Sequence, residues 1–268
     1  MTYERELDAT GFSEVIVERR DVSVPGSITR MTVCLARPST PGDHPVVLVG
    51  PELWGVNEDA RTVARRLAAH GHVAVVPNLY HRADPDSARG FPRSDANRTH
   101  AFNLVARLTR DEVEADLRAA AAHARRHAGA ADRTGMLGFS LGGHIAYFAA
   151  TRLDLAAVAA YYPGWLTTPG TALSRPGPLV DQTHRIAAAG TALALFYAEH
   201  DHVIDAAQVA QVRGALADSG VRHEVTVHPG AAHAFFFPGH ATYDKVAADA
   251  SWERVVALFR TELRGGTG

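Results

Sequence analysis

The chain has very little cysteine, and this scarcity excludes several kinds of site. Its 268 residues include one cysteine, Cys34. A lone cysteine can form neither an internal disulfide nor a CxxC redox pair, and it cannot assemble a cysteine-rich zinc site. This composition suits a reducing compartment, so we expect a cytoplasmic protein.

The sequence also lacks an excess of positive charge and a long apolar run. Lysine and arginine together number 27 against 29 acidic residues, which gives a net charge of −2. Binding to a phosphate backbone requires a basic balance instead. The amino terminus reads MTYERELDAT, with charges where a signal peptide would be apolar, and no run approaches about 18 apolar residues. We therefore expect no nucleic-acid partner, no membrane partner and no secretory signal.

What the sequence does contain is enough apolar material for a sizeable core. Hydrophobic residues make up 46% of the chain. A chain of this length buries about three quarters of the surface that its unfolded form exposes. Because α/β folds routinely reach this size without splitting, we expect a single domain over residues 1–268.

Two periodicities alternate along the chain. Segments typical of strands lie at residues 13–18, 28–36, 46–49, 73–76, 135–139, 155–161, 192–197 and 223–227. The last six alternate with helical stretches, which predicts a mostly parallel sheet with helices on both faces. No helix separates the first two, so they should form an antiparallel edge.

The expected helices carry recognisable start signals. Asn57 is an N-cap for a helix that stops at Gly71, and Thr109 with Glu112 forms a capping box. Further helices are expected at residues 141–151, 206–219 and 243–263. Two long connections, residues 81–108 and 163–180, do not fit the alternation. Such connections often carry binding or lid functions.

The segment around Ser140 carries the clearest chemical signal. Gly138, Ser140 and Gly142 form a G-x-S-x-G pattern between an expected strand and an expected helix. This pattern is typical of a sharp turn that exposes the serine hydroxyl at the amino end of a helix, where developing negative charge is stabilised. The alternative is that Ser140 merely caps the helix.

Two further residues complete a candidate catalytic triad. Asp201 and His233 each follow an expected strand, and the carboxyl ends of parallel strands converge on one crevice. The chain order Ser, Asp, His is that of α/β-hydrolases. Glu199 and Asp205 are rival acids. A metal site over residues 199–202 is disfavoured, because adjacent residues rarely point at one ion.

These residues resemble the dienelactone hydrolases of the α/β-hydrolase superfamily, and the resemblance spans most of the chain. Residues 52–57 (ELWGVN) look like the family's glutamate-bearing loop, and residues 77–82 (PNLYHR) resemble its Asp-Leu-Tyr-x-Arg segment. Residues 138–143 (GFSLGG) are similar to its Gly-Tyr-Cys-Leu-Gly-Gly elbow. Asp201 and His233 match its acid and base. The resemblance implies an α/β-hydrolase fold with a mostly parallel central sheet, antiparallel N-terminal strands and helices on both faces.

Two positions depart from the family pattern. The family's usual cysteine nucleophile is replaced by Ser140, which needs a base to take its proton. The family's glutamate, matched by Glu52, controls the charge of that thiol; with serine, a loop carboxylate paired with Arg82 is an equal alternative. A second arginine that binds a substrate carboxylate is replaced by Phe237. We therefore expect a substrate with at most one negative charge.

The expected reaction is cleavage of an ester or lactone through an acyl-enzyme. Ser140 attacks, His233 accepts its proton, and Asp201 orients the imidazole. The backbone N–H groups of Leu53 and Leu141 would hold the oxyanion. Further substrate-binding candidates from the resemblance and from aromatic character are Glu52, Trp54, Tyr80, Arg82, Trp165 and Phe235.

Each of those aromatic residues could equally belong to the core, and Arg82 could instead form a salt bridge with Glu52. We expect no metal, no organic cofactor, and a monomer or homodimer. The alternative function is a non-hydrolytic cyclisation, elimination or rearrangement on the same fold, or ligand binding without catalysis. An assay with p-nitrophenyl acetate and a phosphonate probe would separate these alternatives.

Overall fold

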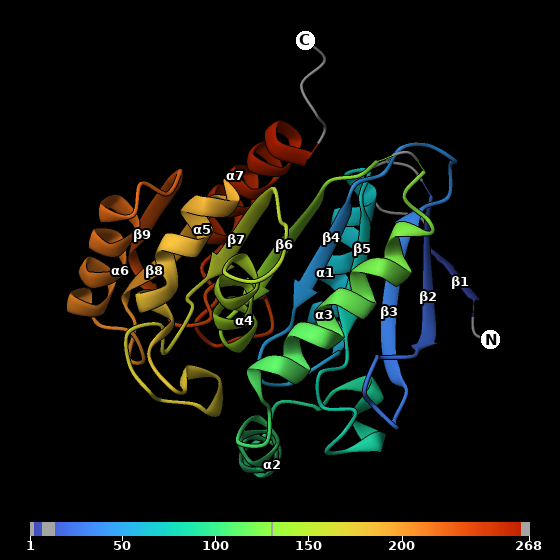
Figure 1. Cartoon of the computed structure of the whole chain (residues 1–268), viewed down its shortest axis with the longest axis horizontal. Coiled ribbons are helices and arrows are strands. Elements are labelled where there is room, and N and C mark those ends of the chain that lie inside the picture. The colour runs from blue at the N-terminus through green and yellow to red at the C-terminus, as the bar shows by residue number, and fades with distance from the viewer. Residues whose placement is uncertain (1–2, 7–13, 130, 264–268) are drawn as a thin grey trace. The chain divides into compact units, whose positions relative to one another are not determined.

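The computed structural model describes residues 3–6, 14–129 and 131–263 (Figure 1). The chain divides into two compact units, residues 1–135 and 136–268. A single domain over residues 1–268 stays a prediction. Ser13, where we expected the first strand to begin, lies outside the described residues.

The first unit contains a sheet with strand order β1-β2-β3-β5-β4. The strands are β1 (Tyr3–Glu6), β2 (Val15–Val22), β3 (Met31–Pro38), β4 (Val46–Gly50) and β5 (Val73–Pro77). Pairing is antiparallel from β1 to β2, β2 to β3 and β3 to β5, and parallel between β4 and β5. The expected antiparallel edge is confirmed. It also includes β1, whose sequence YERE carries too much charge to suggest a strand.

The helices of the first unit are α1 (Glu58–Ala69), α2 (Asp95–Val105) and α3 (Arg110–Arg125), with a 3-10 turn η1 (Pro85–Arg89). The two predicted N-caps are confirmed: Asn57 Oδ1 accepts the N–H of Ala60 at 3.1 Å, and Thr109 Oγ1 accepts that of Glu112 at 3.3 Å. The Glu112 carboxylate accepts the Thr109 hydroxyl at 2.8 Å, so the reciprocal bond of a capping box is not formed. Both α1 and α3 contact β3, β4 and β5. Within this unit, α3 crosses the strands in Figure 1.

The second unit contains strands in the order β6-β7-β8-β9. They are β6 (Thr134–Phe139), within which the unit boundary falls, β7 (Ala157–Tyr161), β8 (Ala192–His200) and β9 (His223–Ala232). β8 pairs in parallel with both β7 and β9. Every residue of β6 and β7 is buried, which explains their continuous apolar sequences.

The helices of this unit are α4 (Leu141–Ala150), α5 (Thr183–Ala189), α6 (Ala206–Asp218) and α7 (Lys245–Leu263), with 3-10 turns η2 (Ala172–Ser174) and η3 (Leu179–Gln182). The predicted α/β alternation is confirmed, but α2 and α5 were missed. α2 lies inside a connection that we expected to be irregular. None of the helices within residues 14–129 and 131–263 combines the length and apolar content that crossing a bilayer requires.

An aromatic core in the second unit packs the neighbours of Ser140 and His233 against each other. Phe139 directly precedes Ser140, and its ring stacks on Tyr161 with a centroid separation of 4.7 Å. The rings of Phe236 and Phe237, soon after His233, each lie 4.9 Å from that of Phe139. Because buried rings in contact resist displacement, this core positions two segments far apart in sequence.

Candidate active site

The turn from β6 to α4 holds Ser140 in a strained conformation. Its φ is 51° and its ψ is −111°, a region that non-glycine residues rarely occupy. The backbone passes so close to itself that a Cβ on Gly138 would lie 2.0 Å from the carbonyl oxygen of Gly142. A Cβ on Gly143 would lie 2.8 Å from the carbonyl oxygen of Tyr161. These glycines are therefore required by the turn that presents Ser140.

The Ser140 hydroxyl faces His233 and makes no capping hydrogen bond to α4. Its Oγ lies 3.1 Å from Nε2 of His233, which follows β9. The alternative in which this serine merely caps the helix is therefore wrong.

Asp201, directly after β8, orients the other side of the His233 ring. Its Oδ2 lies 2.8 Å from Nδ1, and its Oδ1 accepts the N–H groups of Val203 at 2.8 Å and Ile204 at 3.1 Å. The carboxylate is fully buried. An ionised carboxylate can only accept, so Nδ1 of a neutral ring carries the hydrogen and Nε2 is left to accept from the Ser140 hydroxyl.

The rival acids have other partners. Glu199 accepts the backbone N–H of Gly230 at 2.8 Å, and Asp205 forms a capping box with Gln208 at the start of α6. In the described part of the chain, no group of three or more His, Cys, Asp or Glu side chains is arranged to hold a metal ion.

Two rings that the predicted site did not include flank His233. The Tyr162 ring centroid lies 4.9 Å from that of His233, and the His202 ring meets it edge-on at 5.6 Å. Tyr162 has a φ of 37°, and Ala234, next to His233, has a φ of 64°. The signal that could have found Tyr162 is its position just after β7, at the carboxyl end of a parallel strand.

In the first unit, the turn that carries Leu53 is held on both sides. The N–H of Gly55 donates to the carbonyl of Glu52 at 3.1 Å, and the Tyr80 hydroxyl donates to the carbonyl of Leu53 at 3.0 Å. Burial raises the pKa of Tyr80, so its hydroxyl stays protonated and donates. In a planar trans peptide, the N–H of Leu53 points opposite to the bonded carbonyl of Glu52.

Arg82 has acidic partners other than the Glu52 that the sequence suggested. Its Nη1 lies 2.7 Å from Oδ2 of Asp116, and its Nε lies 3.7 Å from Oε1 of Glu112. Asp116 is fully buried on α3. The spacing along the chain offered no signal for this pair.

Asp116 also completes a second chain of hydroxyl, histidine and carboxylate. Its Oδ1 lies 3.1 Å from Nε2 of His81, and Nδ1 of His81 lies 2.9 Å from Oγ1 of Thr29. We call Thr29, His81 and Asp116 the first-unit relay. Ser140, His233 and Asp201 form the second-unit relay.

Phe235 was a candidate for either the pocket wall or the core, and its burial favours the core. Its side chain is fully buried, with ring centroids 5.4 Å from Tyr162 and 5.0 Å from His228. Trp54 and Tyr80 are also buried. Among the four expected wall aromatics, Trp165 is half-buried. The sequence left both roles open because a ring in the core and a ring in a pocket wall have the same side-chain chemistry.

Comparison with known proteins decides the family. The sequence model of the dienelactone hydrolase family matches residues 31–263. The chain belongs to the dienelactone hydrolase family. A Synechocystis relative named as a carboxymethylenebutenolidase is 34% identical over 250 residues, covering 91% of this chain and 96% of the relative. A Bradyrhizobium relative named as a 2-oxo-3-(5-oxofuran-2-ylidene)propanoate lactonase is 30% identical over 232 residues, covering 86% and 89%.

Solved structures agree with this membership. The crystal structure of a dienelactone hydrolase from Klebsiella pneumoniae is 30% identical with a TM-score of 0.78, and the match covers 92% of this chain and 99% of that one. A dienelactone hydrolase-like phosphotriesterase from metagenomic libraries, at 23% identity and a TM-score of 0.72, shares the fold. The predicted α/β-hydrolase fold is confirmed. Membership of the dienelactone hydrolase family makes this chain an ester or lactone hydrolase.

Proposed function

We propose that the chain cleaves its ester or lactone through an acyl-enzyme formed on Ser140. The observation that carries this proposal is the contact of Ser140 Oγ with His233 Nε2 at 3.1 Å, continued from Nδ1 to Asp201 at 2.8 Å. A serine hydroxyl is a weak nucleophile until a base takes its proton, and this arrangement supplies that base.

The reaction follows from the direction of these hydrogen bonds. Ser140 Oγ attacks the carbonyl carbon while its proton moves to Nε2 of His233. The tetrahedral intermediate collapses, the carbonyl carbon–oxygen single bond breaks, and His233 returns the proton to the departing alkoxide. Water then attacks the acyl group with His233 as base and frees Ser140. Asp201 stabilises the imidazolium in both half-reactions.

We propose that the backbone N–H of Leu141 binds the oxyanion, and the family resemblance implies the backbone N–H of Leu53 as a second donor. Leu141 is the first residue of α4, where N–H groups lack intrahelical partners and the helix dipole favours negative charge. The turn at Leu53 is held by Gly55 and Tyr80, so its N–H is preorganised rather than free to rotate.

We propose a mostly apolar substrate. It carries no carboxylate that depends on a cationic side chain for binding. Phe237, at the position of the family's second arginine, is buried against Phe139. Arg82, at the position of the first, already binds the buried Asp116. A substrate carboxylate would have to compete with that ion pair, and an anion desolvated without a partner costs several kcal/mol.

The test is covalent trapping of the nucleophile. A fluorophosphonate should add one phosphonyl group to the wild-type protein, measured by intact mass, and Ser140→Ala should abolish the adduct. His233→Ala should slow labelling strongly, because the hydroxyl loses its base. Ser219→Ala, which removes a hydroxyl after α6, is the matched control and should label normally.

Three outcomes would contradict the proposal. Labelling of Ser140→Ala at the wild-type rate would assign the nucleophile elsewhere. Normal hydrolysis of p-nitrophenyl acetate by Ser140→Ala would reject the acyl-enzyme on this residue. Labelling of Ser140 without hydrolysis of any ester or lactone would favour the non-hydrolytic alternative.

A further inference from the structure

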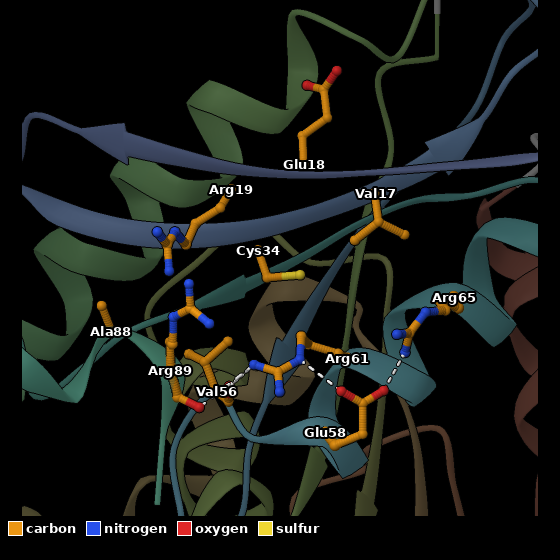
Figure 2. A pocket seen from close by; sticks show the side chains of 10 residues that line it. All are labelled: Val17, Glu18, Arg19, Cys34, Val56, Glu58, Arg61, Arg65, Ala88 and Arg89. Atoms are coloured by element: carbon orange, nitrogen blue, oxygen red, sulfur yellow. Dashed lines mark hydrogen bonds and ion pairs between the residues drawn. The ribbon is translucent and has the colours of Figure 1, made fainter. Parts of the chain in front are cut away.

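A charged cavity of about 250 Å³ lies in the first unit (Figure 2). Its charged lining consists of Glu18 and Arg19 from β2, Glu58, Arg61 and Arg65 from α1, and Arg89 from η1. None of these residues belongs to either relay. The cavity therefore requires an explanation separate from the proposed hydrolysis.

Two of the arginines are fixed in place by one carboxylate. Glu58 binds Arg61 Nε at 3.0 Å and Arg65 Nη1 at 2.8 Å. Arg61 Nη1 also donates to the carbonyls of Val56 at 2.8 Å and Arg89 at 3.4 Å. These bonds make a preorganised basic wall and join α1 to η1.

The other two arginines lack such a carboxylate partner within the described part of the chain. Figure 2 shows the guanidinium groups of Arg19 and Arg89 pointing toward each other. Among the residues that the structure describes, no carboxylate lies within ion-pair distance of either. Glu18 points away from the cavity in Figure 2, and its carboxylate binds Arg20 at 2.9 Å and Arg37 at 3.7 Å. Two like charges that face each other across a cavity favour an anion between them.

The thiol in the cavity adds no competing negative charge. Cys34 is buried, and burial raises the pKa of its thiol to about 11, so it is neutral near pH 7. Of the two glutamates in the lining, Glu58 is thus the one whose carboxylate faces the four guanidinium groups.

We propose that this cavity binds the phosphate group of a small molecule, clamped between Arg19 and Arg89. A carboxylate has two oxygens and one charge, which a single guanidinium satisfies in bidentate fashion. Two guanidinium groups that point toward each other, without a carboxylate partner among the described residues, suit an anion with more oxygens and more charge. Phosphate has this chemistry, and arginine is well suited to bind it.

The experiment is calorimetric titration of the intact protein with inorganic phosphate at constant ionic strength. Arg19→Ala and Arg89→Ala should each weaken binding about tenfold or more, since each removes charge-assisted hydrogen bonds. Both side chains are exposed, so these variants should remain folded, which thermal unfolding will verify. Arg118→Ala removes the same charge from an exposed position on α3 and should change the affinity less than twofold.

Ser140→Ala should bind phosphate as the wild type does, so this result is independent of the proposed nucleophile. Absence of binding at millimolar phosphate would overturn the proposal. An equal loss of affinity in Arg118→Ala would show non-specific attraction and would also overturn it. Tighter binding of malonate than of phosphate would reject phosphate as the ligand class.

Discussion

The second-unit relay and the first-unit relay each join a hydroxyl, a histidine and a carboxylate in that order. The residues are Ser140, His233 and Asp201 in the second unit, and Thr29, His81 and Asp116 in the first. The hydroxyl-to-histidine and histidine-to-carboxylate distances are 3.1 and 2.8 Å in the second-unit relay, against 2.9 and 3.1 Å in the first-unit relay. Both carboxylates are fully buried. Hydrogen-bond distances alone therefore do not distinguish them, although the hydroxyl contacts Nε2 of His233 in one relay and Nδ1 of His81 in the other.

Their surroundings differ in two respects. Ser140 lies on a strained turn at the amino end of α4, whereas Thr29 Oγ1 also contacts Ser27 Oγ at 3.1 Å. Asp201 is bonded by two neutral backbone N–H groups, whereas Asp116 binds the Arg82 guanidinium at 2.7 Å. A carboxylate already neutralised by a cation has less charge left to stabilise an imidazolium. The comparison teaches that a catalytic relay needs a presented hydroxyl and an uncommitted carboxylate.

Removing each hydroxyl in turn gives the largest expected contrast. Ser140→Ala should lower turnover of p-nitrophenyl acetate by about 10⁵-fold, because the acyl-enzyme can no longer form. Thr29→Ala should leave turnover within about twofold and cost about 1 kcal/mol of stability, as one lost hydrogen bond does. Steady-state kinetics on both variants measure this. Comparable losses of turnover would mean that the two relays do not differ in function.

The second contrast uses the histidines and their coupling. His233→Ala should cost nearly as much turnover as Ser140→Ala, and the double variant should cost little more, because the two residues act as one unit. His81→Ala should act through stability instead, by removing a partner of the buried Asp116. Rate measurements on the single and double variants test this. Multiplicative losses from Ser140 and His233 would assign them separate roles.

Arg82→Ala should break the ion pair that distinguishes the first-unit relay. Leaving Asp116 buried without its cation should destabilise the fold by about 3 kcal/mol, measured by urea unfolding. Arg118→Ala, which breaks an exposed pair with Glu114, should cost less than about 0.5 kcal/mol. If Arg82→Ala leaves stability unchanged but selectively weakens kcat/KM for a carboxylate-bearing ester, Arg82 binds substrate instead.

The smallest expected effect is a pH dependence at His228, which packs on Phe235 in the second unit. Burial lowers the pKa of His228 below that of an exposed histidine. The unfolded chain then binds a proton at a higher pH than the folded chain does. His228 therefore contributes stability that is present above the unfolded pKa, about 6.5, and is lost as the pH falls through the lower folded pKa.

Replacing that histidine sharpens the same comparison. His228→Phe should make the fall in unfolding free energy between about pH 7.5 and pH 5.5 shallower than in the wild type. His202→Phe changes an exposed histidine and is the matched control, with a wild-type slope expected. Denaturant unfolding at several pH values provides the measurement. An unchanged slope in His228→Phe would show that this histidine does not contribute to the pH dependence.

Much of the fold could be predicted because its signals are local. The caps at Asn57 and Thr109 depend on residues within one helical turn, and both α1 and α3 begin directly after them. The buried strands β6 and β7 are apolar throughout. In contrast, β1 and α2 carry weak apolar patterns and are stabilised by neighbours, so their sequences did not indicate them.

The sequence by itself determined the G-x-S-x-G turn, the chain order of Ser140, Asp201 and His233, and the family. These features depend on the spacing of residues along the chain. A glycine or the end of a strand indicates the same local backbone structure whichever distant residues surround it. Only the tertiary structure decided that Arg82 binds Asp116, 34 residues away, that Phe235 is core, and that Arg19 and Arg89 share one cavity. The physical reason is that ion pairs and burial depend on which distant side chains meet, and charge or apolarity alone leaves many partners equally compatible.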